Sequence, residues 1–159
     1  MKTLLLGAMV SLVLQTGLAF GPDWVGKTAP DFTLRTLDGG SNLSLKDCRG
    51  SVVVVDFWAS WCAPCKRSLP QLASLESNGV RVIAVNVDDV RQNGVEFLKR
   101  NNISVTALYD GQKTVASRYD VPAMPSALII DKSGVVRFLH IGYTADDFAE
   151  FKRQIERLR

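Results

Sequence analysis

The chain has 159 residues, of which 47% are hydrophobic and 22% are charged, so its composition indicates one globular domain and excludes a disordered protein. The formal net charge is +3 at pH 7, and Lys2 in a predicted leader contributes one of these charges. This net positive charge is too small to indicate binding to nucleic acid or to an anionic membrane surface.

The first 19 residues have the pattern of a signal peptide. Lys2 precedes an apolar run from Leu4 to Leu14, and small residues lead to a cut site after Ala19. The run is shorter than the roughly 20 residues that a spanning helix needs, and an uncleaved anchor is the alternative interpretation. We therefore expect residues 1–19 to be removed, which leaves residues 20–159 as one exported, periplasmic domain without a membrane span.

The first half of the mature chain predicts a hairpin, a strand and a helix. Asp38-Gly39-Gly40 is a turn signal within residues 32–45, which favours an N-terminal β-hairpin. Residues 52–57 form a β-branched run without alternation, which is typical of a central strand covered on both faces. A helix is expected from residue 62 to residue 78, with Gly79 at its C-terminal end.

The second half continues the alternation. The expected elements are a buried strand at 81–87, a helix that includes 95–99 and ends at 101–102, a short strand at 107–109, a short helix at 115–119 and a hairpin of strands at 126–130 and 135–141. Residues 144–147 resemble a capping box before a last helix, on which Phe148, Phe151, Ile155 and Leu158 share one face. This order predicts an α/β fold, with a mixed sheet and helices on both of its faces.

The chain has three cysteines, an odd number, so at most one intramolecular disulfide can form. Cys62 and Cys65 are separated by two residues, and a disulfide between them would close a ring too small to add much stability. The pair therefore indicates redox chemistry or half of a metal site.

A cysteine that follows a strand at the first turn of a helix lies beside unsatisfied backbone N–H groups, which favour the nucleophilic thiolate. Cys62 is predicted to have this position and to attack a partner's disulfide, after which Cys65 would attack back. Pro64 is tolerated in the first helical turn, and Trp61 would offer a flat apolar surface beside the attacking sulfur.

Two other interpretations of the pair remain open at this point. A zinc site needs three or four ligands, but the further candidates, Cys48 and His140, stand at unrelated positions. A purely structural disulfide is the second alternative. The expectation is therefore no metal site and no cofactor other than a redox-active Cys62–Cys65 disulfide.

Residues 55–66, with the motif Trp61-Cys62-Ala63-Pro64-Cys65, resemble the active-site segment of thioredoxin, and Pro70 matches the proline that kinks its active-site helix. Residues 121–126 resemble the segment that holds the family's cis-proline, here Pro125. The resemblance implies that Pro125 lies against the active-site disulfide and that the backbone of Met124 pairs with substrate. An ordinary loop proline is the alternative.

Residues 29–34 and 86–125 resemble instead the exported TlpA/ResA/CcmG branch, which adds an N-terminal hairpin and a central βα insertion to the thioredoxin-like fold. Members of that branch are mostly periplasmic or membrane-tethered reductants that serve cytochrome c maturation, copper-site assembly or thiol repair. The resemblance implies protein disulfide or thiol clients, a membrane partner that supplies reducing thiols, and a monomeric protein.

Three positions depart from the pattern of the branch or of thioredoxin. Ser68 stands where many branch members have Glu, and Asp56 stands where many have Asn. A buried Asp56 would take the proton of Cys65 during exchange, because desolvation raises a carboxyl pKa toward neutrality. The alternative is that Asp56 only forms hydrogen bonds near a strand end. Ala84 occupies the place of a thioredoxin lysine near this Asp, which leaves Asp56 less supported.

Two expectations concern thiol chemistry. Cys48 is predicted to be a small packing group, with a free thiol for intermolecular pairing as the alternative. Ala63 and Pro64 place no cation between the active cysteines, so the dithiol is expected to be reducing. Its potential should lie nearer the roughly −270 mV of thioredoxin than the roughly −120 mV of DsbA.

Two alternative functions share these residues. Thiol peroxidases of a related group have a Thr three residues before the reactive cysteine, where this chain has Ala59. A copper or apocytochrome chaperone would hold its cargo through the same thiols, but related copper chaperones use Cys-x-x-x-Cys and a His, whereas the gap here is two residues. Tight copper binding by the reduced protein would favour the chaperone.

Overall fold

The computed structural model describes residues 23–159, which form a seven-stranded mixed sheet in the order β2-β1-β5-β4-β3-β6-β7. The strands are β1 (Thr33–Thr36), β2 (Asn42–Ser44), β3 (Val52–Trp58), β4 (Val80–Asn86), β5 (Thr106–Tyr109), β6 (Ser126–Ile130) and β7 (Val136–Ile141). The helices are the short 3-10 helix η1 (Leu45–Cys48), α1 (Cys65–Ala73), α2 (Arg91–Arg100), α3 (Thr114–Arg118) and α4 (Asp147–Leu158).

Strand β3 lies at the centre of the sheet, and each of its residues is buried. It pairs in parallel with β4 and antiparallel with β6. Val52 and Val54 contact one hydrophobic cluster, whereas Val53 and Val55 contact the other, because successive side chains point to opposite faces. The prediction of a central strand covered on both faces is confirmed.

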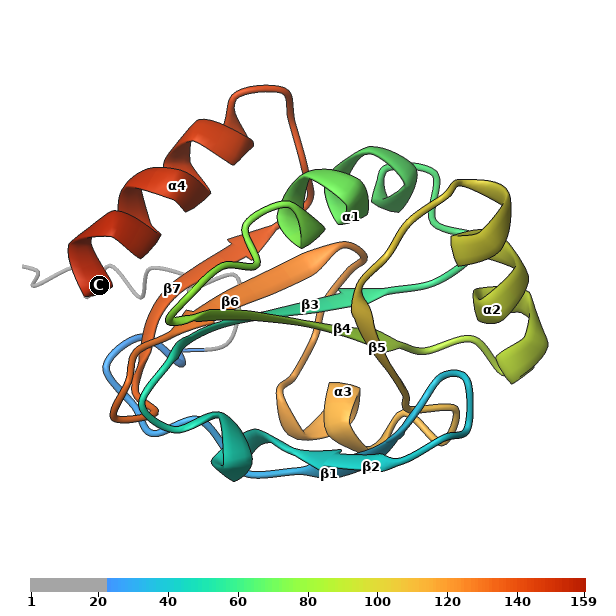
Figure 1. Cartoon of the computed structure of the whole chain (residues 1–159), viewed down its shortest axis with the longest axis horizontal. Coiled ribbons are helices and arrows are strands. Elements are labelled where there is room, and N and C mark those ends of the chain that lie inside the picture. Colours follow the sequence, from blue (N-terminus) through green and yellow to red (C-terminus); the bar gives the residue numbers. More distant parts are fainter. Residues whose placement is uncertain (1–22) are drawn as a thin grey trace, which may run out of the picture.

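Helices cover both faces of this sheet. Figure 1 shows α1 and α4 on one side and α3 on the other. On the first side, Leu72 of α1 and Phe151 and Ile155 of α4 pack in one cluster. On the second side, Val115 and Ala116 of α3 belong to the larger cluster. The predicted α/β class, with a mixed sheet between helices, is confirmed.

The N-terminal hairpin and the central insertion meet in the sheet. Strands β1 and β2 pair antiparallel, and β1 also pairs antiparallel with β5. Strand β5 pairs in parallel with β4, so the insertion lies between the hairpin and the rest of the sheet. Both predicted additions are therefore present, and together they extend one edge of the sheet.

The predicted end of the first helix was wrong. Helix α1 ends at Ala73 rather than at residue 78, because residues 74–79 form turns before β4. In these turns the Glu76 carboxylate accepts the Val82 N–H at 2.6 Å, and Gly79 has a φ of +81°. Leu75 still packs against the core, which explains its helix-like spacing. Helix α2 begins at Arg91 and ends at Arg100, so residues 95–99 are part of a helix as predicted.

The last helix packs with three of the four predicted side chains. Phe151 and Ile155 are buried and Leu158 packs beside them, whereas Phe148 lies under the Lys152 ammonium, 4.7 Å from its ring centroid. The capping box forms in one direction, since the Asp147 carboxylate accepts the Thr144 N–H. The helix itself begins at Asp147, so Thr144 lies in the preceding turn.

The predicted signal peptide (residues 1–19) and the first residues of the predicted domain (20–22) lie outside the described residues. Within residues 23–159, no helix has the length and apolar character needed to cross a membrane.

Candidate active site

Cys62 and Cys65 form a disulfide at the junction of β3 and α1, with an S–S distance of 2.09 Å and a Cα–Cα distance of 5.3 Å. Helix α1 begins at Cys65, so Cys62 lies just before the helix and not in its first turn as predicted. The Cys65 N–H donates to the Cys62 sulfur at an N–Sγ distance of 3.3 Å. Cys62 is 4% exposed and Cys65 is fully buried, so Cys62 is the less buried residue of the pair.

The loop before β6 carries the predicted cis-proline. The peptide bond between Met124 and Pro125 is cis, and Pro125 is buried. The Gly142 N–H donates to the Pro125 carbonyl at 2.8 Å, and the Ser126 hydroxyl donates to the Ala123 carbonyl at 2.6 Å. Within residues 23–159, no hydrogen bond joins the Met124 backbone to another residue. The N–H and C=O groups of Met124 therefore have no partner among the described residues.

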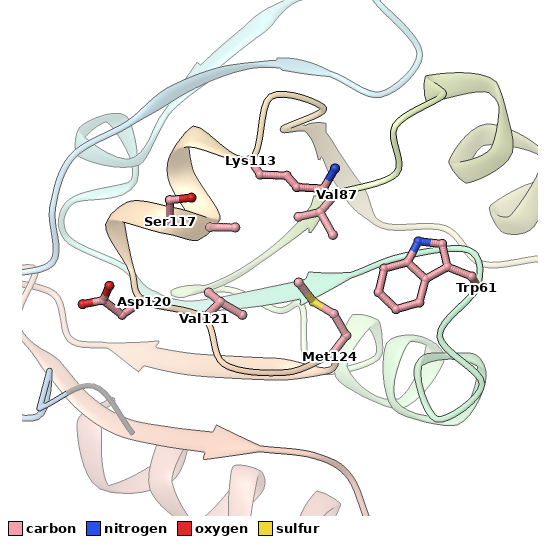
Figure 2. Close-up of a pocket in the computed structure, with 8 residues that line it drawn as sticks. Trp61, Val87, Lys113, Ser117, Asp120, Val121 and Met124 are labelled. Carbon is pink, nitrogen blue, oxygen red and sulfur yellow. The ribbon is translucent and has the colours of Figure 1, made fainter. Parts of the chain in front are cut away.

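A groove with a cavity volume of about 550 Å³ runs beside Trp61, which is 68% exposed, and brings the cysteine loop and the cis-proline loop together. Figure 2 shows Trp61 at one end of the groove and Asp120 at the other. Five apolar residues and three polar ones line it: Trp61, Val87, Ala116, Val121 and Met124, then Lys113, Ser117 and Asp120. Its volume falls in the roughly 300–1,000 Å³ range typical of ligand pockets.

Two buried aspartates accept hydrogen bonds from the segments that form the walls of the groove. Asp88 follows β4, and its carboxylate accepts the Ser60 N–H at 3.0 Å, the Ser60 hydroxyl at 2.8 Å and the Asn86 amide at 2.7 Å. Asp110 follows β5, and its carboxylate accepts the Ala116 N–H at 2.8 Å. Asp88 therefore holds the cysteine loop, and Asp110 holds the start of α3.

The sequence interpretation missed these two aspartates and the groove residues from α3. The two aspartates could have been found from their positions, because they follow shortly after the ends of β4 and β5. The carboxyl ends of parallel strands meet at one edge of a sheet, where ligands bind. The cysteine loop follows β3, which is parallel to β4, and therefore lies at the same edge.

Asp56 lies fully buried in β3, paired in register with Ala84 of β4 and Ala127 of β6. The predicted neighbourhood of Ala84 is confirmed. Alternation along β3 places Asp56 on the same face as Val52 and Val54, which is the face that α1 covers. Burial raises the pKa of the Asp56 carboxyl well above its ordinary value.

Ser68 of α1 is also fully buried. Neither its hydroxyl nor the Asp56 carboxylate has a hydrogen-bond partner among residues 23–159. Buried polar groups of native proteins are almost always satisfied, so each unsatisfied atom needs an explanation, and a catalytic role is one of them. The Asp56 carboxylate of β3 and the Ser68 hydroxyl of α1, the helix that begins at Cys65, are therefore both available to form further hydrogen bonds.

The remaining cysteine and the histidine lie away from the groove residues. Cys48 is free and 3% exposed, and burial raises the pKa of its thiol. His140 of β7 stacks on Phe138 and lies 3.0 Å (Nε2 to Oδ2) from the Asp147 carboxylate, which ties β7 to α4. Within residues 23–159, no three His, Cys, Asp or Glu side chains are grouped so that they could hold a metal ion.

Solved structures contain the same fold. The crystal structure of a chain assigned as a thiol:disulfide interchange protein DsbE, from Chlorobium tepidum, superposes with a TM-score of 0.79 at 34% identity, covering 84% of this chain and 96% of that one. This likeness confirms the thioredoxin-like fold that the motifs implied.

Relatives found by sequence are also named as thiol–disulfide exchange proteins. The thiol-disulfide oxidoreductase ResA of Geobacillus thermodenitrificans is 34% identical over 139 residues, which cover 85% of this chain and 78% of ResA. The thiol:disulfide interchange protein DsbE of Escherichia coli is 31% identical over 121 residues, covering 74% of this chain and 65% of DsbE. The Redoxin family model matches residues 24–155. With its Cys62–Cys65 disulfide at the carboxyl edge of a thioredoxin-like sheet, the chain belongs to the Redoxin family and is a thiol–disulfide oxidoreductase.

Proposed function

We propose that this protein is an exported reductant of protein disulfides. The observation that carries the proposal is the asymmetry of the active pair: Cys62 follows the exposed Trp61 at the groove and is itself 4% exposed, whereas Cys65 is fully buried. A less buried first cysteine and a fully buried second one suit an attack on a large partner followed by internal resolution. The absence of a cation at positions 63 and 64 favours the reducing direction.

The proposed cycle starts from the dithiol. The Cys62 thiolate attacks one sulfur of the client disulfide, the client S–S bond breaks, and the other client sulfur leaves as a thiolate that takes up a proton. Cys65 then loses its proton and attacks the Cys62 sulfur, which releases the second client thiol. The client gains two electrons, and the Cys62–Cys65 disulfide forms. The dithiol supplies these electrons itself, so the cycle uses no other cofactor and no metal.

Asp56 is proposed to take the proton from Cys65. Its carboxyl is buried on the face of β3 that α1 covers, and burial raises its pKa. A carboxylate with a raised pKa is a stronger base, and its proton affinity comes closer to that of a thiol. The missing hydrogen-bond partners leave the Asp56 oxygens available for this proton.

The client is proposed to bind on the loops that border the groove. Trp61 offers an exposed aromatic surface beside Cys62, and the Met124 backbone is free to pair with an extended client segment. Pro125 would hold that loop edge against the disulfide. Main-chain pairing of this kind accepts many sequences, which suits a reductase with protein clients.

The cellular role follows from the predicted leader and from the relatives. Residues 1–19 have the pattern of a signal peptide, which supports a periplasmic location. In an oxidising compartment a reductant has to be re-reduced, so we propose a membrane partner that supplies thiols. Apocytochromes and copper-site proteins, whose cysteines must be reduced before they bind their cofactors, are the proposed clients. The protein is proposed to act as a monomer.

The test is reduction of insulin disulfides by the mature domain with dithiothreitol as the electron source. Wild type should accelerate the reaction, and Cys62→Ser should abolish the acceleration. A Cys65→Ser variant should accumulate a mixed disulfide with its client, which can be isolated and identified. An inert wild type whose cysteine pair still cycles between oxidised and reduced forms would refute general reductase activity.

A further inference from the structure

The groove extends the active site away from the cysteines and toward α3 and the segment that follows it. One end is formed by Trp61 and Met124, whose loops carry the disulfide and the cis-proline (Figure 2). The floor continues over Val87 and Ala116 to Val121, all apolar. A client segment whose cysteine reaches Cys62 therefore lies beside an apolar cavity large enough for a bulky side chain.

The far end of the groove carries an uncompensated negative charge. Lys113 lies at the rim, but its ammonium forms an ion pair with Asp89, and this contact raises the pKa of Lys113. Asp120 is exposed, and within residues 23–159 it forms no ion pair. A basic side chain of a client would therefore find a partner at Asp120, whereas an acidic one would be repelled.

The groove is built before any client arrives. Asp110 accepts the Val115 and Ala116 N–H groups at 3.0 and 2.8 Å and so fixes α3, whose Ala116 and Ser117 line the cavity. Asp88 fixes the loop before Trp61 through Ser60. Because these walls are already ordered, little of the binding free energy is lost to ordering them. A client that makes better contacts inside the groove should therefore bind more tightly than one that does not.

We infer that the groove selects clients that carry a bulky apolar residue next to the target cysteine and a basic residue further along the same segment, with Asp120 as the residue that recognises the basic group. This inference rests on the proposed function and adds the substrate class to it. Apolar contact supplies most of the preference, because an exposed charge pair is worth little in water.

Four short peptides test the inference, each carrying one cysteine as a mixed disulfide with glutathione. The neighbour of the cysteine is Leu or Ser, and a residue a few positions away is Lys or Glu. The pre-reduced protein is mixed with excess peptide, and the second-order rate constant is divided by that for hydroxyethyl disulfide, a substrate too small to fill the groove. Leu should react about tenfold faster than Ser, and Lys about two- to fivefold faster than Glu.

The Asp120→Asn variant assigns the charge preference. Asn tolerates the left-handed conformation of residue 120, where φ is +47°, so the loop is preserved. The variant should lose the preference for Lys over Glu and keep the preference for Leu over Ser. The matched control is Glu156→Gln on α4, an exposed carboxylate on the other face of the sheet (Figure 1), which should keep both preferences.

Equal rates for the four peptides, together with normal reduction of hydroxyethyl disulfide, would overturn the inference and leave the proposed function standing. A charge preference that persists in Asp120→Asn would overturn the assignment of Asp120. Failure to reduce even hydroxyethyl disulfide would instead refute the proposed function, and the inference with it.

Discussion

The backbone N–H of Cys65 donates to the sulfur of Cys62, with 3.3 Å between the two atoms. Cys65 is the first residue of α1, and its N–H also donates to the Cys62 carbonyl at 3.1 Å, so two acceptors of Cys62 share this donor. In the reduced protein the same donor would face the Cys62 thiolate and stabilise its charge. Cys65 is fully buried, and within residues 23–159 its sulfur accepts no hydrogen bond that would stabilise a thiolate.

This relationship predicts unequal reactivity of the two thiols. In the reduced protein, iodoacetamide should alkylate Cys62 at least about tenfold faster than Cys65 at pH 7, because Cys62 is both the more exposed and the more ionised thiol. Peptide mapping by mass spectrometry measures the two rates. Cys48, which is buried and has a raised pKa, serves as the internal control and should remain unmodified. Equal alkylation of Cys62 and Cys65 would contradict the assignment of the nucleophile.

The residue before Cys65 is predicted to tune the reduction potential. Wild type should equilibrate with glutathione at a potential near the roughly −270 mV of thioredoxin, and a value more oxidising than about −180 mV would refute this. Replacement of Pro64 by His places a cation beside the thiolate and stabilises the reduced form. A tenfold stabilisation corresponds to a shift of about 30 mV toward the oxidising side. The Ala63→Val variant, which adds no charge, is the control and should shift the potential less.

The Asp56→Asn variant is predicted to be more stable than wild type above acidic pH. Burial raises the Asp56 pKa in the folded state, so the folded protein holds this proton more tightly than the unfolded chain. Wild type therefore loses stability as the pH rises from the unfolded pKa, about 3.9, toward the raised folded pKa. Asn mimics the protonated carboxyl and lacks this loss. The gain in unfolding free energy should grow over that window to about 1–3 kcal/mol, measured by urea denaturation of the oxidised protein.

The same variant should slow the release of the client. Asn accepts no proton from Cys65, and general bases contribute roughly 10²–10⁴-fold to such steps. We expect decay of the mixed disulfide to slow by at least about tenfold at pH 7. The defect should shrink as the pH rises, because hydroxide then deprotonates Cys65. A stability gain without any slowing of this step would show that Asp56 has no part in proton transfer.

The Asp88→Ala variant is predicted to weaken both stability and activity. The Asp88 carboxylate accepts hydrogen bonds from Ser60 and Asn86, and its loss leaves the Ser60 N–H and the Asn86 amide without that partner. Unsatisfied buried groups of this kind cost about 1–3 kcal/mol each. Urea denaturation and insulin reduction would measure the two effects. Asp47→Ala, which removes an exposed carboxylate in η1, should change neither.

Much of the fold was predictable because its signals are local. The β-branched run of β3 and the Asp38-Gly39-Gly40 turn of the hairpin depend on side chains and neighbours within a few residues. The end of α1 was not predictable, because Leu75 packs in the core with helical spacing although the chain has already turned. The spacing of apolar residues shows which side chains are buried. A buried leucine in a turn after the helix can keep the helical spacing, so the spacing alone does not show where the helix ends.

The sequence by itself determined the reactive pair, since the two-residue spacing between Cys62 and Cys65 places both sulfurs at one helix end whatever surrounds them. It also determined the cis-proline segment through its resemblance to thioredoxin. Only the tertiary structure decided that Cys62 is less buried than Cys65 and that residues as distant as Val87, Ala116 and Asp120 line the groove next to Trp61. Accessibility and the shape of a cavity arise from the packing of segments far apart in the chain, and local sequence does not encode the distances between them.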